Sequence, residues 1–135
     1  MSMMNPYAQY FENRITTATP GKILIMTFEA ALRFAKTARE KMLEHDLEGQ
    51  NTYIGKVQSI LVELMGALNH DAAPKLAASL DDIYTYAYDT LTTANLRDNV
   101  ALMDEVIELI SSMYEVWTEA EASARMGAES GTKAA

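Results

Sequence analysis

The sequence predicts an all-α protein, an antiparallel four-helix bundle with a short N-terminal helical or extended cap segment. Three Pro and six Gly among 135 residues are few for the many turns of an all-β fold. Apolar residues recur at steps of three and four along four long stretches, as on one face of an α-helix. A chain of this length supports one hydrophobic core rather than two. We therefore expect a cap segment at residues 1–18, a bundle at 19–124 and a flexible tail at 125–135.

The first helix should run from Pro20 to about Glu44. Thr19 is placed to cap it, and proline suits the first helical position because the missing N–H has no partner there. No helix breaker follows until residues 44–49. The expected inward stripe is Leu24, Phe28, Ala31, Ala35, Ala38 and Met42.

The second and third helices have their own start and stop signals. Asp46 can cap a helix that runs to about Leu68, and residues 69–71 end it. Pro74 opens the next helix, which residues 95–99 break. The expected inward positions are Ile54, Val57, Leu61, Leu64 and Leu68 on the second helix, and Leu76, Leu80, Ile83, Ala87, Leu91 and Ala94 on the third.

Asn99 is a suitable cap for the fourth helix. Two apolar stripes share this helix, and a single neighbouring helix cannot cover both. After about Ala124 the sequence becomes small and polar without a period, so the tail is expected to fray. The stripes are Leu102, Val106, Leu109, Met113 and Val116, and Met103, Ile107, Ile110, Tyr114 and Trp117.

Charge and composition disfavour several partners and compartments. A net charge of -8 repels nucleic-acid backbones and anionic membranes. The absence of cysteine removes disulfides, thiolate metal sites and thiol nucleophiles, and it fits a reducing compartment. The sequence shows neither a signal peptide nor a run of about 18 apolar residues. We expect a cytoplasmic protein with no nucleic-acid partner and no membrane insertion.

The sequence contains no pattern typical of catalysis or metal binding. A di-metal site in a bundle needs inward carboxylates and a Glu-x-x-His motif on two helices. The two histidines, His45 and His70, instead follow Met42 and Ala67 by three residues and fall at expected helix ends. We therefore expect no enzymatic activity, no cofactor and no metal site.

The chain has more apolar surface than one core absorbs. Tyr84, Tyr86 and Tyr88 occur within five residues, and at 100° per residue they cannot all point into one core. Singly exposed tyrosines are ordinary. Together with the double stripe of the fourth helix, however, they favour an apolar groove that receives an amphipathic partner helix.

Several motifs follow one another in order between about residues 5 and 120. They are Tyr10; Thr16-Thr17-Ala18-Thr19-Pro20; Leu24, Met26, Phe28-Glu29 and Ala31-Leu32-Arg33-Phe34; Ile60, Glu63-Leu64 and Leu68; Leu80, Ile83-Tyr84, Tyr86, Leu91 and Ala94-Asn95; and Val106 to Trp117. This ordered set resembles the FliS family of flagellar secretion chaperones, which are flagellin-specific. Two features depart from the family pattern: Thr85 stands where an acidic residue is usual, and residues 71–74 replace a glycine-rich turn.

The resemblance implies a cytosolic bundle that binds the C-terminal segment of flagellin. Family members keep flagellin from polymerising early and help to deliver it to the flagellar type III export apparatus. In the family the client segment lies along apolar grooves of the bundle as helices and extended chain. The N-terminal segment of the chaperone occupies part of that site when it is empty.

Candidate flagellin-binding residues are taken from the surplus apolar positions and the cap segment. The sequence does not separate groove from core, so several of them must be ordinary core. The aromatic residues of the cap segment either pack on the bundle permanently, as part of the fold, or cover the client site until the client displaces them. The alternative function is a homodimeric adaptor with no flagellin client, formed through the same surplus surface. The candidates are Tyr7, Tyr10, Ile54, Val57, Leu61, Met65, Ile83, Tyr84, Ala87 and Leu91.

Overall fold

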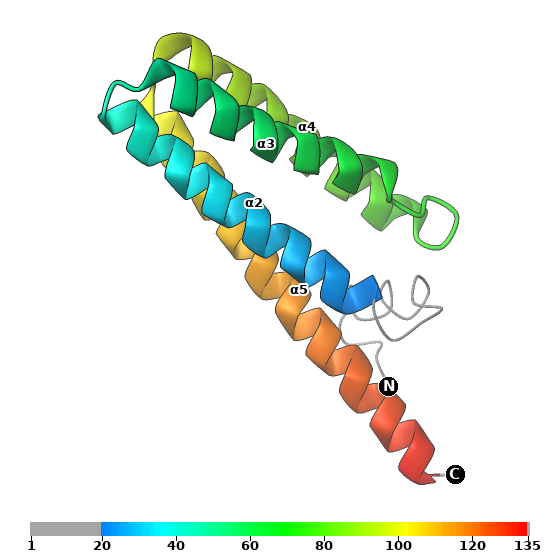
Figure 1. The fold of residues 1–135 in the computed structure, drawn as a ribbon. Coiled ribbons are helices and arrows are strands. Elements are labelled where there is room, and N and C mark those ends of the chain that lie inside the picture. The colour runs from blue at the N-terminus through cyan, green and yellow to red at the C-terminus, as the bar shows by residue number, and fades with distance from the viewer. Residues whose placement is uncertain (1–19, 135) are drawn as a thin grey trace.

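Four long helices make up the part of the chain that the computed structural model describes, which is residues 20–134, with side-chain surroundings for residues 21–127. Consecutive helices run antiparallel (Figure 1), which confirms the predicted all-α bundle. The cap segment lies outside the described residues. The helices are α2 (Pro20–Leu43), α3 (Leu47–Gly66), α4 (Pro74–Arg97) and α5 (Val100–Ala134).

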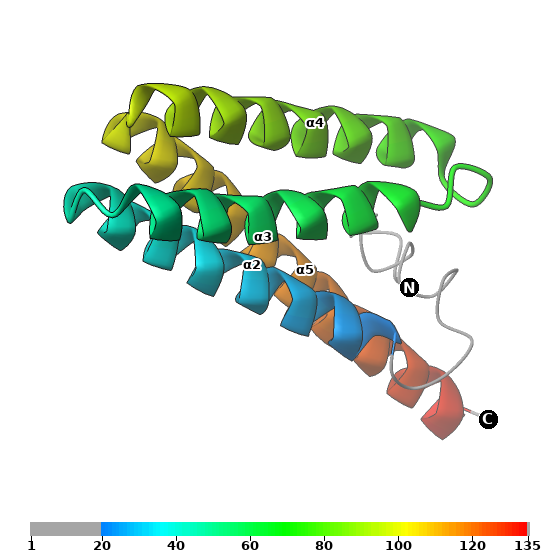
Figure 2. The ribbon, with the colours of Figure 1, turned by 45° about the horizontal axis from the view of Figure 1, so that its top comes forward.

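The helices form a ring in which each packs on two neighbours. α2 contacts α3 and α5, and α4 contacts the same two helices, so α2 and α4 face each other across the core. The α3/α4 pair and the α2/α5 pair lie close together at the end that carries the α2–α3 and α4–α5 connections. They diverge toward the connection between Gly66 and Pro74, as Figure 1 and Figure 2 show.

Both small and large side chains are buried along the core. Toward the close end, the fully buried Ala38 of α2 and Ala94 of α4 let the helix backbones approach. From the middle toward the diverging end, large rings fill the wider space. The ring centroid of Phe28 lies 6.4 Å from that of Tyr84 and 6.4 Å from that of Trp117. These three rings therefore join α2, α4 and α5 in the core.

A buried amide closes the narrow end of the bundle. Gln50 of α3 is 1% exposed, and its Nε2 donates to Asn95 Oδ1 at 3.0 Å and to Asp98 Oδ1 at 2.8 Å. Asp98 has left-handed backbone angles, φ 51° and ψ 44°, and ends α4. The amide thus ties the start of α3 to the end of α4.

Side-chain caps confirm two of the predicted helix starts. Asp46 Oδ1 accepts a hydrogen bond from the Gly49 backbone N–H at 2.9 Å. Asn99 Oδ1 accepts one from the Leu102 N–H at 3.1 Å. Thr19, the predicted cap of α2, lies outside the described residues.

The burial pattern of α5 shows how the two predicted stripes are used, and α5 packs on both α2 and α4. The face of α5 that points into the core lies between the two predicted stripes. The buried residues therefore come from both stripes. The outer members are half-buried on its two flanks, with Leu109 and Met113 on one side and Ile107 and Tyr114 on the other. The buried members are Met103, Val106, Ile110 and Trp117.

The diverging end leaves some predicted core positions half-exposed. Leu24, Leu68 and Leu76 all lie at that end and are only partly buried, because the helix pairs separate there. α5 continues as a helix beyond Ala124 to Ala134, further than the apolar period predicts. The expected flexibility of residues 125–135 stays a prediction. Within residues 20–134, no helix is both long and apolar enough to cross a membrane.

Replacing Asp46 by alanine should lower the free energy of unfolding by about 1 kcal/mol, because the Gly49 N–H loses its acceptor. The Lys41 ammonium also loses a carboxylate oxygen 3.7 Å away, which adds little at an exposed site. Urea unfolding followed by circular dichroism should show a lower midpoint and an unchanged slope. Asp46→Asn keeps the capping oxygen and should recover most of the loss; equal losses would contradict the capping role.

Candidate functional site

α4 and α5 enclose an apolar groove on the outside of the bundle. Its deeper part is a cavity of about 90 Å³, lined by Ile83 of α4 and by Ser112, Met113, Val116 and Trp117 of α5. Trp117 is 1% exposed, whereas Ile83, Met113 and Val116 are half-buried. The indole therefore forms a floor, and the three aliphatic side chains present accessible apolar surface above it.

A wider and more polar part continues the groove from Ser112. It has a volume of about 340 Å³. The α5 residues of the two parts together span about 18 Å along the helix at 1.5 Å per residue, which is about three turns. The additional lining residues are Tyr86 of α4 and Glu105, Glu108 and Leu109 of α5.

The rim of this wider part is acidic. The Tyr86 hydroxyl donates a hydrogen bond to Glu105 Oε2. That bond raises the pKa of Tyr86, because it stabilises the neutral phenol and because a phenolate would stand beside a carboxylate. Glu108 lies one turn further along α5 on the same rim. The groove thus combines an apolar floor with a negative edge.

A second apolar depression lies on the outside of α2 and α3, with a volume of about 350 Å³. Ile23 and Met26 of α2 line it and are 57% and 62% exposed. Ile60 of α3 completes the apolar lining, and Glu63 supplies a charge at its edge. Such exposed aliphatic side chains at one place are typical of an interaction surface.

The structure separates the candidate residues that it describes into core and surface. Met65 and Ile83 are half-buried, and of these Ile83 lines the α4/α5 groove. Tyr7 and Tyr10 lie outside the described residues. Contact of the ten candidates with a client stays a prediction. The six that are buried in the core are Ile54, Val57, Leu61, Tyr84, Ala87 and Leu91.

Several groove residues are missing from the candidates chosen by sequence. Leu109, Met113 and Val116 line the α4/α5 groove. All three belong to one of the two apolar stripes recognised on the fourth helix, so the signal was present. Only the packing of α5 shows that these three residues lie on the flank of the core.

The histidines lie away from the α4/α5 groove. His45, in the α2–α3 connection, and His70, between α3 and α4, are both exposed. Among the residues with described side chains, no three His, Cys, Asp or Glu lie close enough together to hold a metal ion.

The fold and the grooves together define a class of protein: a helical bundle with apolar grooves on its outside. Comparison with known proteins identifies the family. The family model described as "Flagellar protein FliS" matches residues 3–124. The chain therefore belongs to the FliS family, which confirms the resemblance seen in the sequence.

Curated relatives from several bacteria carry the name flagellar secretion chaperone FliS. The Bacillus subtilis relative is 32% identical over 125 residues, which cover 93% of this chain and 92% of the relative. The Campylobacter jejuni relative is 28% identical, over 84% of this chain and 88% of its own length. The Salmonella typhimurium relative is 27% identical, over 87% of this chain and 89% of its own length. The similarity thus spans nearly the full length of both partners in each comparison.

Replacing Glu105 by glutamine should lower the pKa of Tyr86 toward the ordinary tyrosine value of about 10, because the carboxylate that raises it is removed. Tyrosinate absorbance titration should show this shift, with Tyr86→Phe identifying the contribution of this residue. The raised pKa in the folded state means that the bond stabilises the protein below about pH 10 and ceases to do so as the pH rises through that pKa. Identical titration curves for wild type and Glu105→Gln would contradict the assignment.

Proposed function

We propose that the protein is a cytosolic export chaperone that binds the C-terminal segment of flagellin. In this role it prevents premature polymerisation and aids delivery to the flagellar type III export apparatus, by binding alone and without catalysis. The α4/α5 groove carries the proposal, because half-buried aliphatic side chains line it above Trp117. Relatives named flagellar secretion chaperones support the class of function.

The groove offers a client segment the apolar contact that its ordering requires. When a disordered segment folds on binding, its ordering costs about 2–5 kcal/mol or more of the binding free energy. Full burial of one leucine-sized side chain contributes about 1.5–3 kcal/mol. Ile83, Met113 and Val116 border one cavity, and Leu109 lies one turn along α5 from Met113. Two or three client side chains seated there would contribute about 3–9 kcal/mol against the ordering cost.

An amphipathic helix fits this geometry. Leu109, Met113 and Val116 are separated by four and three residues, so their side chains form a stripe along α5. A client helix that lies between this stripe and α4 would insert its own apolar residues at the same spacing. The acidic edge at Glu105 and Glu108 favours basic or neutral residues along that side of the client.

Other surfaces are proposed to extend the client site. A long client segment would also use the α2/α3 depression, where Ile23 and Met26 are exposed. Met65 remains a candidate because part of its side chain is accessible. For the six buried candidates we propose support of the groove from within the core, as Tyr84 adjoins Ile83 on α4.

The cap segment is proposed to cover part of the client site in the free chaperone and to be displaced on binding. Tyr7 and Tyr10 are three residues apart, so one helical turn would present both rings to the same surface. At up to about 3.3 Å per extended residue, the segment is long enough to reach along much of the bundle. Competition of this kind weakens client binding by no more than the free energy with which the cap segment itself binds the site.

Replacing Ile83 or Met113 by glutamine should weaken binding of a flagellin C-terminal peptide about tenfold, since each change removes an apolar anchor of about 1.4 kcal/mol or more. Isothermal titration calorimetry measures the affinity directly. Fluorescence of Trp117, the single tryptophan of the chain, reports filling of the groove above it.

Leu96→Gln is the matched control, because this leucine is 81% exposed and lies outside the groove. Its affinity should equal that of the wild type. Unfolding midpoints of all three variants separate a loss of binding from a loss of folding. Absence of measurable binding by the wild type, or a tight dimer that the peptide leaves unchanged, would contradict the proposed function.

Deleting residues 1–15 should raise the affinity for the flagellin peptide, because a competing segment is removed. Tyr7→Ala combined with Tyr10→Ala should have the same effect in the full-length chain. Calorimetry on both variants tests this expectation, with thermal unfolding measured in parallel. Unchanged affinity together with a lower melting temperature would show instead that the cap segment is a fixed part of the fold.

A further inference from the structure

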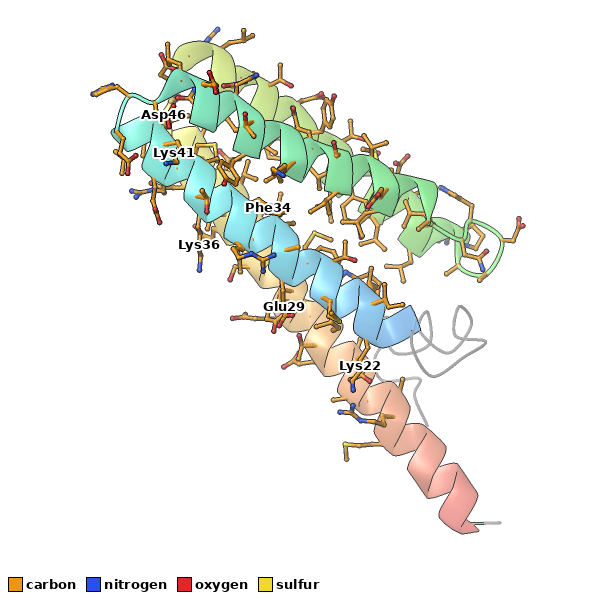
Figure 3. All side chains as sticks on the ribbon, in the orientation of Figure 1. Lys22, Glu29, Phe34, Lys36, Lys41 and Asp46 are labelled. Carbon is orange, nitrogen blue, oxygen red and sulfur yellow. The ribbon has the colours of Figure 1, made fainter. Side chains whose placement is uncertain are left out.

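A third groove, on the outside of α2 and α5, has a different chemistry. Its volume is about 460 Å³, and Glu29, Leu32, Arg33, Lys36 and Tyr114 line it. Arg33 and Lys36 are exposed, and Leu32 and Tyr114 are half-buried. Figure 3 shows Glu29 and Lys36 on the side of α2 that faces α5, with Phe34 on the side toward α3. This groove therefore places two cations beside apolar side chains.

Two side-chain pairs set the register between these antiparallel helices. The Tyr114 hydroxyl donates to Glu29 Oε2 at 2.9 Å. At the other end of the groove, Arg39 Nε lies 2.5 Å from Asp104 Oδ1. Residue numbers change in opposite directions along the two helices, so position 36 is level with Ile107 and position 33 with position 110. At this level of α5 the one acidic residue is Glu108, which lines the α4/α5 groove instead.

Arg33 and Lys36 share this groove with one carboxylate, that of Glu29, which accepts the hydrogen bond from Tyr114. Neither forms an ion pair among the residues with described side chains. The guanidinium carbon of Arg33 lies 5.3 Å from the ring centroid of Phe34, and Lys56 Nζ lies 5.3 Å from the same ring on its α3 side. Two cations thus lie against this one half-buried ring.

This cationic surface stands out against the charge of the whole chain. The protein carries -8 overall, yet α2 holds five basic and only two acidic side chains. α5 has the opposite balance, with seven acidic and two basic residues. An anionic partner would thus be attracted to the α2 side and repelled by most of the remaining surface.

We propose that the α2/α5 groove docks an acidic, amphipathic helical segment of a second protein, distinct from the flagellin client. Arg33 and Lys36 are three residues apart, so they are neighbours on one helix face and match carboxylates three or four residues apart on a partner helix. An apolar side chain between those carboxylates fits against Leu32 and Tyr114. The partner would span about 15 Å, the rise of α2 from Glu29 to Arg39.

The docking groove and the α4/α5 groove can be filled at the same time. Met113 lines one and Tyr114 lines the other. The side chains of these consecutive residues point about 100° apart around the axis of α5, on opposite flanks of its buried stripe. An acidic partner can therefore recognise the chaperone while the client remains bound, and the inference does not depend on the identity of that client.

The test uses a helical peptide of about 15 residues with glutamates three and four apart around leucine, and a twin with glutamine for every glutamate. The full-length protein should bind the acidic peptide and not its twin, with affinity falling about tenfold between about 50 and 500 mM salt. The double variant R33E/K36E should lose binding. It should retain a wild-type circular dichroism spectrum, since both residues are exposed, and wild-type affinity for the flagellin peptide.

Lys22→Glu with Lys75→Glu is the matched control, because it changes the net charge equally at exposed sites outside the groove. It should bind the acidic peptide as the wild type does. Equal binding of the glutamine twin, or an equal loss in the control, would overturn the proposal. So would tighter, groove-dependent binding of RNA or phosphatidylglycerol vesicles, or salt-sensitive dimerisation that R33E/K36E abolishes, since the occupant would then be a polyanion or a second copy.

Discussion

The architecture depends on the contact of three aromatic rings, Phe28, Tyr84 and Trp117, in the core. Phe28 lies on α2, Tyr84 on α4 and Trp117 on α5, and all three side chains are buried. Well-packed interiors leave few voids, so the size of buried side chains sets the distance between helices. These rings therefore set the spacing of α2, α4 and α5 where they meet.

The same packing decides which surfaces of α5 remain available. Its buried stripe through Ile110 and Trp117 faces the core, and apolar residues flank it on both sides. Neither neighbouring helix covers these flanks completely. On the α4 side the result is an aliphatic groove with an acidic rim, and on the α2 side it is a groove lined by the exposed cations Arg33 and Lys36. α5 thus lines two grooves of different chemistry, one with α4 and one with α2.

Membership of the FliS family and the geometry of the grooves contribute different information. The match over residues 3–124 shows the family, whose curated relatives are named flagellar secretion chaperones. The structure gives this class of function a physical basis, because Ile83, Met113 and Val116 present apolar surface that the core does not use. A binding protein for a segment that is poorly ordered alone needs such surplus surface.

The sequence by itself determined the helices, their order and most of the core. Caps such as Asp46 and Asn99 and the period of three and four residues act between near neighbours, so they can be read without knowing the fold. Only the tertiary structure decided which apolar residues form core and which form groove. Adjacent residues show this clearly: Tyr84 is buried and Ile83 is half-exposed, although the period favoured Ile83 as inward. That outcome depends on where neighbouring helices cross and diverge, and no local pattern encodes that crossing.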